Sequence, residues 1–242
     1  MGRGGDRASG AKRSQLASGN AIEIAHSPSR HFPSYACSHG TDSLDSGLLM
    51  SDSPRTMSIQ ESLNDSIAAI RSVSNLESQI LQAADLLLET LIQGRKVLVC
   101  GNGGSASDSA HLATEIACRF LIDRRPYPAI SLSSEGGLMT AIGNDYSFDE
   151  IFSHQVKGFG QAGDLLVAFT TSGKSKNVTL ALETARKSGL KTIAFLGRDG
   201  GECRGIADIE LLVSHPLTAK IQEAHKVIIH LLCELVEPQL SR

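Results

Sequence analysis

Residues Lys96 to His111 read KVLVCGNGGSASDSAH, a short apolar run that ends in a glycine-rich turn and continues into a helical pattern. A strand, a glycine turn and a helix in this order form a common phosphate-binding unit, because free N–H groups at the start of the helix attract an anion. The spacing Gly101-x-Gly103-x-x-Ala106 also fits the dinucleotide-binding fingerprint. The stretch therefore predicts a phosphate site and leaves open which molecule carries the phosphate.

Similar apolar or β-branched runs recur along the chain, at residues 96–100, 128–132, 164–170, 191–196 and 208–213. Turn residues and a helical pattern follow each of the first four, and the last leads into a helical pattern from Ala219 to Val236. This alternation predicts an α/β fold, a three-layer sandwich whose central five-stranded parallel sheet is covered by helices on both faces. Ligands of such sheets bind at the carboxyl ends of the strands.

The N-terminal part of the chain divides near residue 57. Residues 1–56 show no sustained periodicity, and we expect a disordered N-terminal extension that function does not need. An Arg- and Ser-rich transit peptide is the alternative, but the acidic residues in this segment speak against it. We favour a translation start that lies upstream of the domain. From Ser58, a capping box with Glu61 and helical spacing up to Gly94 predict one long helix or two. Residues 57–242 are expected to form one domain.

Composition excludes several classes of protein. With 23 basic and 26 acidic residues, the net charge of -3 leaves no basic surface suited to nucleic acid. Five cysteines lie far apart without C-x-x-C spacing, which speaks against disulfides and favours the cytoplasm. No apolar run is long enough to span a bilayer, so we expect no membrane partner.

A second loop follows the third predicted strand and reads TTSGKS, Thr170 to Ser175. Four hydroxyl groups at the start of a helix suit a phosphate monoester, since they add side-chain donors to the free backbone N–H groups. The alternative is that Ser175 only caps the helix. A nucleotide P-loop is disfavoured because Ala168 stands where that motif requires glycine.

Two helices place polar side chains near these loops. His111 and Glu115 are four residues apart and share one face of the helix that the first loop begins. Gln222 and His230 lie on nearly the same face of the last helix, about 12 Å apart along its axis. A dinucleotide site remains open, with Glu135 as the acidic residue for the ribose. The remaining histidines are interpreted as surface or hydrogen-bonded core residues, namely His154, His215 and His225.

These segments together resemble the phosphoheptose isomerases, enzymes with a sugar isomerase (SIS) domain of flavodoxin-like type. The resemblance runs from about Met57 to Glu237 and rests on motifs that include GNGGSASDSAHLATE, IGNDYSFDEIF, FTTSGKSKNV and IQEAHKVIIH. It implies conversion of sedoheptulose 7-phosphate to D-glycero-D-manno-heptose 7-phosphate through an enediol, for bacterial lipopolysaccharide or surface-glycan biosynthesis. It also implies a homotetramer with sites between subunits.

The resemblance further implies roles for individual residues. Glu115 matches the catalytic base, and His230 matches the catalytic acid. The substrate-binding residues would be Asn102, Gly103, Gly104, Ser105, Glu115, Asn144, Asp145, Thr170, Thr171, Ser172, Ser175 and Gln222. In some members zinc is bound at positions that correspond here to His111, Glu115, Gln222 and His230.

Three alternative functions remain open. A non-catalytic relative that binds the bacterial replication initiator keeps the fold but lacks the glutamate and the last histidine, and Glu115 and His230 are both present here. Another SIS isomerase acting on a different sugar phosphate is the nearest enzymatic alternative. For a dehydrogenase, binding of NAD(H) would be the deciding observation.

Overall fold

The computed structural model describes residues 58–241. The predictions of a disordered extension over residues 1–56, and of a domain boundary at residue 57, lie outside the described residues. Among the described residues, none of the helices has the length and apolar character needed to cross a membrane.

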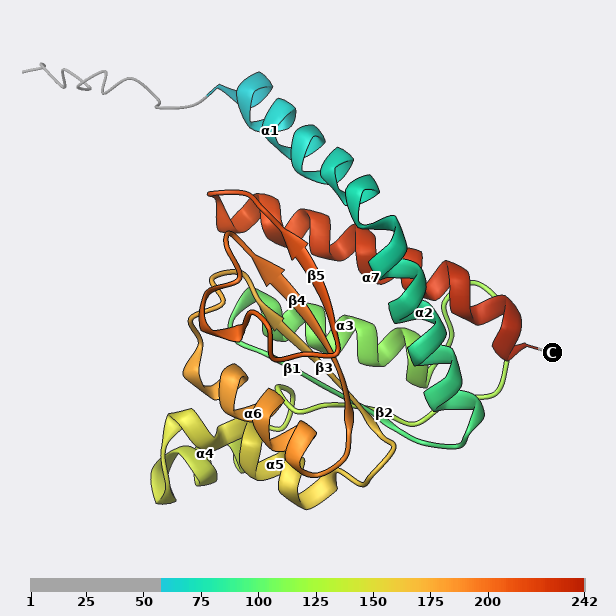
Figure 1. Cartoon of the computed structure of the whole chain (residues 1–242), viewed down its shortest axis with the longest axis vertical. Helices are drawn as coiled ribbons and strands as arrows, with labels where there is room; N and C mark the ends of the chain where they lie inside the picture. The colour runs from blue at the N-terminus through green and yellow to red at the C-terminus, as the bar shows by residue number, and fades with distance from the viewer. Residues whose placement is uncertain (1–57, 242) are drawn as a thin grey trace, which may run out of the picture. The chain divides into compact units, whose positions relative to one another are not determined.

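Helices and strands alternate as the sequence predicts (Figure 1). The strands are β1 (Val97–Gly101), β2 (Ala129–Ser131), β3 (Leu165–Thr170), β4 (Lys191–Gly197) and β5 (Ile209–Val213). The α-helices are α1 (Ile59–Ser72), α2 (Glu77–Ile92), α3 (Gly104–Ala117), α4 (Gly136–Asp145), α5 (Ile151–Phe159), α6 (Lys176–Lys187) and α7 (Thr218–Leu240). Short 3-10 turns are η1 (Val73–Leu76), η2 (Phe148–Glu150) and η3 (Gly201–Cys203).

The five strands form one parallel sheet in the order β2-β1-β3-β4-β5. This order confirms the predicted five-stranded parallel sheet and has the flavodoxin-like pattern, in which the switch point lies between β1 and β3. The two loops singled out in the sequence follow β1 and β3, and these strands are neighbours. The topology therefore brings both loops to the same edge of the sheet.

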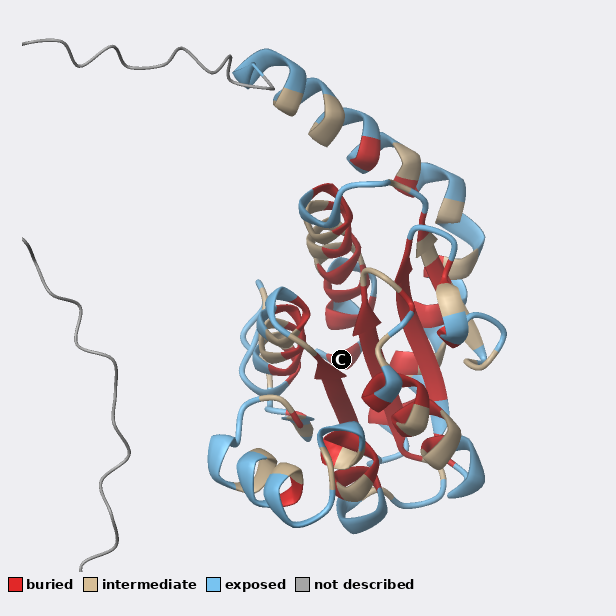
Figure 2. Ribbon diagram, turned by 90° about the vertical axis from the view of Figure 1, so that its left-hand side faces the viewer, coloured by how far each residue is buried: buried red, intermediate tan, exposed pale blue. Residues whose placement is uncertain are grey.

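Two apolar cores lie on opposite faces of the sheet. One packs α2, α3 and α7 against alternate side chains of the strands, including Val99, Val167 and Phe195. The other packs α4, α5 and α6 against the intervening side chains, such as Leu98 and Ala168. Figure 2 shows the central strands buried between these two layers of helices. Complete burial of β1 and β3 explains why their sequences are apolar at nearly every position.

The N-terminal helices have the predicted start and are two in number. The Ser58 side chain accepts a hydrogen bond from the Glu61 N–H while the Glu61 carboxylate accepts one from the Ser58 N–H, which completes the capping box. The 3-10 turn η1 separates α1 from α2. Helix α1 extends beyond the sheet with most of its surface exposed (Figures 1 and 2). Its apolar residues Ile59 and Leu63 are 80% and 52% exposed.

Candidate active site

The first glycine-rich loop depends on close backbone contacts. A Cβ atom at Gly101 would lie 2.6 Å from the carbonyl oxygen of Ser105, so only glycine lets the chain turn this sharply from β1 into α3. Gly103 caps α3 with a φ of 56°, a conformation that L side chains rarely adopt. The turn aims the N-terminus of α3 at the edge of the sheet where ligands bind.

The second loop presents hydroxyl groups at the N-terminus of α6. Ser175 is the N-cap residue, but its side chain makes no capping hydrogen bond. Its hydroxyl instead lies 3.4 Å from the Thr170 hydroxyl, which also accepts a hydrogen bond from the Gly173 N–H. The Ser172 hydroxyl accepts from the N–H of Lys174. The alternative interpretation of Ser175 as a simple helix cap is therefore not supported.

A reciprocal pair of amides joins the first loop to the first turn of α6. The Asn102 side chain donates to Asn177 over 2.8 Å and accepts from it over 3.0 Å. Asn177 lies in the first turn of α6 and is 2% exposed. Asn102, predicted to contact substrate, is thus held by a partner that sequence patterns do not reveal, since 75 residues separate the two.

Helix α7 lies against the first loop at Gln222. A Cβ atom at Gly104 would overlap the amide group of the Gln222 side chain, so the two residues are in direct contact. Gly104 is the first residue of α3. The structure therefore places the Gln222 side chain against the first loop.

His111, Glu115 and His230 form a side-chain cluster between α3 and α7. His111 Nε2 lies 2.9 Å from Glu115 Oε1 and 3.4 Å from His230 Nε2. The His230 ring stacks on Phe120, with 5.7 Å between ring centroids. The side chains of His111 and Glu115 are 27% and 19% exposed, so the cluster is accessible from solvent. A carboxylate beside two imidazoles can move protons between neighbouring atoms of a bound molecule.

Two further residues belong to this cluster and were missed in the sequence. Lys226, on α7, places its ammonium group 2.8 Å from Asp108 Oδ1 and 2.9 Å from His111 Nδ1. Asp108 is 4% exposed and its other oxygen, Oδ2, has no hydrogen-bond partner among the described residues. The signal for Asp108 was its spacing of three residues from His111 on α3, which places both on one face.

The arrangement does not fit a zinc ion at the four predicted ligands. An ammonium group has hydrogen-bond donors only, so His111 Nδ1 must accept from Lys226, and Nε2 carries the hydrogen. That nitrogen is the one that faces Glu115 and His230, and ligation requires a free lone pair. Gln222 contacts the first loop. Within residues 58–241, no three His, Cys, Asp or Glu side chains are arranged to hold a metal.

Other predicted residues lie apart from the cluster. The side chains of Asn144 and Asp145, at the end of α4, are exposed, and Asn144 donates a hydrogen bond to Asp145. His225 is fully buried and bonds the Leu196 carbonyl oxygen, as expected for a core histidine. Burial lowers the pKa of His225 to about 4, although the bond to Leu196 and the charge of Asp108 act in the opposite direction.

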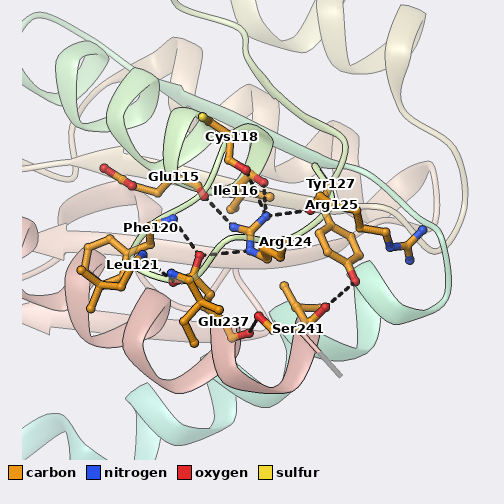
Figure 3. Close-up of polar contacts among 12 residues, drawn as sticks. Glu115, Ile116, Cys118, Phe120, Leu121, Arg124, Arg125, Tyr127, Glu237 and Ser241 are labelled. Atoms are coloured by element: carbon orange, nitrogen blue, oxygen red, sulfur yellow. Dashed lines mark hydrogen bonds and ion pairs between the residues drawn. The ribbon is translucent and has the colours of Figure 1, made fainter.

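A buried ion pair between Arg124 and Glu237 fixes the end of the helix that carries Glu115 (Figure 3). The Glu237 carboxylate accepts hydrogen bonds from the backbone N–H groups of Phe120, Leu121 and Ile122, over 2.6 to 2.9 Å. It also pairs with Arg124, whose guanidinium donates to the carbonyl oxygen of Glu115 over 2.7 Å. The segment that follows α3 is thereby tied to the C-terminal half of α7.

An apolar groove lies away from this site, between α7 and the helices α1 and α2. Arg71, Glu77 and Glu234 border it, and its apolar lining consists of Ile70, Val73, Ile80, Leu81, Val227, Leu231 and Leu235. The groove holds none of the cluster residues. A concave surface this apolar is typical of protein contacts rather than of sugar binding.

Comparison with known proteins adds to this geometry. Residues 62–197 match the family model described as the SIS domain. The phosphoheptose isomerase of Geobacter sulfurreducens is 50% identical over 165 residues, which are 68% of this chain and 87% of the relative. That of Clostridium acetobutylicum is 43% identical over 186 residues, 75% of this chain and 94% of the relative. The solved phosphoheptose isomerase structure from Neisseria gonorrhoeae is similar with a TM-score of 0.70 at 40% identity, covering 74% and 97% of the two chains.

Proposed function

The chain belongs to the phosphoheptose isomerase family of SIS-domain proteins, and we infer that it is an aldose–ketose isomerase that converts sedoheptulose 7-phosphate in heptose biosynthesis. The product would be D-glycero-D-manno-heptose 7-phosphate. The observation that carries this proposal is the contact of Glu115 with His111 on helix α3, which begins at the first glycine-rich loop, and of His111 with His230 on helix α7.

The chemistry of the reaction matches these groups. Moving a carbonyl from C2 to C1 requires a base that removes a proton from one carbon and returns it to the neighbouring carbon of the enediol. Glu115 is the proposed base, because a carboxylate can perform both steps. His230 is the proposed acid that exchanges protons with the substrate oxygens. No redox cofactor is consumed, since oxidation at one carbon balances reduction at the next.

The phosphate group is proposed to bind at the second loop. Thr170, Thr171, Ser172 and Ser175 supply hydroxyl groups, and the N-terminus of α6 supplies backbone N–H groups and a favourable dipole. The absence of a capping bond from Ser175 leaves its hydroxyl available to an anion. The backbone of Gly103, Gly104 and Ser105 is proposed to contact the substrate, together with Gln222. Asn102, Asn144 and Asp145 remain predicted substrate contacts.

A homotetramer with sites between subunits is proposed from the exposed apolar surface. Helix α1 leaves Ile59, Leu63 and Ile67 exposed in the described residues, and the apolar groove adjoins it. Such surface on a helix that extends past its own domain is stabilised by burial against another copy. Light scattering of the purified protein gives the mass, and a monomer at micromolar concentration contradicts the proposal.

Two other predictions accompany this function. A cytoplasmic location agrees with the sequence, in which the cysteines show no disulfide pattern. Zinc binding at His111, Glu115, Gln222 and His230 is what the resemblance to the family implies, and it conflicts with the hydrogen bond that Lys226 makes to His111.

The direct test is an assay with sedoheptulose 7-phosphate in D2O, with the product identified by NMR. An enediol mechanism predicts heptose 7-phosphate with deuterium at the carbon that exchanges its proton. Conversion of another ketose phosphate, with none of the heptulose, points to a different SIS isomerase. Absence of turnover with every sugar phosphate, in the correctly folded protein, refutes the isomerase assignment.

A further inference from the structure

Lys226 lies where two acceptors meet. Its ammonium group is 2.8 Å from Asp108 Oδ1 and 2.9 Å from His111 Nδ1, and it reaches them from α7 across to α3. The Lys226 side chain is 37% exposed, whereas that of Asp108 is only 5% exposed. Burying a carboxylate without a cation destabilises the fold, so the ion pair with Asp108 holds Lys226 in this place.

The contact decides which ring nitrogen of His111 carries the hydrogen. Because Lys226 can only donate, Nδ1 is an acceptor and His111 is the Nε2–H tautomer. The Nε2–H then donates to Glu115 Oε1 over 2.9 Å. A continuous series of hydrogen bonds therefore runs from Asp108 through Lys226 and His111 to Glu115.

We propose that Lys226 is a positioning residue: by holding His111 as the Nε2–H tautomer, it orients the Glu115 carboxylate for catalysis and denies zinc the lone pair of Nε2. The first half of this proposal rests on the proposed role of Glu115 as the base. The second half concerns metal affinity and does not depend on turnover. It also accounts for the misfit between these residues and a metal ion.

Removing the ammonium should reverse the tautomer. In Lys226→Met, Asp108 and the Nδ1 edge of His111 lose their shared donor, and the buried carboxylate favours a protonated Nδ1 as its new partner. Nε2 then has a free lone pair that faces Glu115 and His230. A carboxylate that accepts from the remote nitrogen of a histidine is also the usual outer partner in zinc sites.

The test measures tautomers and zinc affinity in the full-length, metal-depleted protein. Nitrogen-15 NMR of histidine-labelled protein distinguishes protonated from bare ring nitrogens, and His111→Gln identifies the His111 signals. We expect Nε2–H in the wild type and in Lys226→Arg, which keeps a donor, and Nδ1–H in Lys226→Met. Lys187→Met, at an exposed position on α6, controls for the loss of one positive charge.

Zinc competition with a chromogenic chelator provides the second readout. Lys226→Met should bind zinc about 10- to 100-fold more tightly than the wild type, with Lys226→Arg and Lys187→Met unchanged. Metal-free Lys226→Met should lose about 10-fold or more in kcat with little change in KM.

An Nδ1–H signal for His111 in the wild type overturns the proposal whether or not any variant folds. Equal zinc affinity of the wild type and Lys226→Met refutes the metal half, and unchanged kcat refutes the positioning half. If the wild type isomerises no sugar phosphate, the proposed function fails, while the tautomer and zinc results still decide the role of Lys226.

Discussion

Arg124 and Glu237 form an ion pair of 3.1 Å across 113 residues of sequence, with both side chains only 3% exposed. The pair connects the segment between α3 and β2 to the last turns of α7. Because Arg124 also holds the carbonyl oxygen of Glu115, the pair connects the stability of the fold to the position of the proposed base.

Glu237→Gln should lower the free energy of unfolding by about 3 kcal/mol, since it leaves the buried guanidinium of Arg124 without its charge partner. Urea denaturation at pH 7 measures the loss. Glu234→Gln, at an exposed position one turn earlier on α7, is the control and should stay near wild type.

The same pair predicts a pH dependence. Burial raises the pKa of Glu237, but the backbone N–H groups of Leu121, Phe120 and Ile122 and the charge of Arg124 outweigh it, so the pKa is lowered. A lowered carboxyl pKa stabilises the fold above the unfolded-state pKa, and this stabilisation is lost as the pH falls through the folded-state pKa. If the free energy of unfolding falls by the same amount in the wild type and in Glu237→Gln below pH 4.5, this prediction is contradicted.

The buried imidazole of His225 predicts a second loss of stability, at a higher pH than the loss that Glu237 causes. Its pKa of about 4 lies below the unfolded value of 6.5, so the unfolded chain takes up a proton that the native protein does not. Stability is therefore retained above pH 6.5 and falls, by on the order of 3 kcal/mol, as the pH drops toward 4. In His225→Gln, urea denaturation across this range should show a flatter profile. His154→Gln, half-buried on α5, should keep the wild-type slope.

Glu115→Gln should reduce kcat about 100-fold or more, because the amide cannot remove a proton from carbon. The carboxamide preserves size, so the circular dichroism spectrum, the melting temperature and the oligomeric mass should not change. Glu183→Gln on α6 is the matched control. Near-normal turnover of Glu115→Gln removes this residue from the mechanism.

Ser175→Ala should raise KM for the sugar phosphate about 10-fold and leave kcat nearly unchanged. Hydrogen bonds to a charged group contribute about 1.5 to 3 kcal/mol, and a phosphate held equally in the ground and transition states affects binding alone. Steady-state kinetics measure both constants, with Ser188→Ala at the other end of α6 as the control. A fall in kcat at constant KM would place Ser175 in the chemical step instead.

Gly104→Ala should lower kcat/KM while the melting temperature changes little. The added methyl group would overlap the amide of Gln222, and this flexible side chain can move away from the loop without a shift of the backbone. Gly136→Ala is a close control, because Gly136 is also the first residue of its helix and a Cβ there meets no atom within 4 Å. Identical kinetics for the two variants would argue against a role for Gln222.

Most of the fold could be predicted from the sequence, because it depends on local patterns of apolar and turn residues. Buried parallel strands give short apolar runs, and the structure places a strand at each predicted run, with ends that differ by at most one residue. The neighbouring positions of the two loops followed from the topology of parallel sheets.

The cross-chain partners could not be predicted in this way. Lys226 is 115 residues from His111, and Asn177 is 75 residues from Asn102. A helical position occupied by lysine reads as a solvated surface, and an asparagine near a helix start reads as a cap. The energy of such pairs comes from the burial and geometry that only the folded chain creates.

The Asn102–Asn177 pair has a consequence for altering the specificity of this protein. Each amide both gives and receives one hydrogen bond, so the two side chains are interchangeable halves of a single symmetric connection. Replacing either asparagine alone by a residue without an amide would break the connection at one end and leave the other amide without its counterpart. Asn102 and Asn177, which lie 75 residues apart in the chain, therefore have to be changed together when the specificity of this protein is engineered.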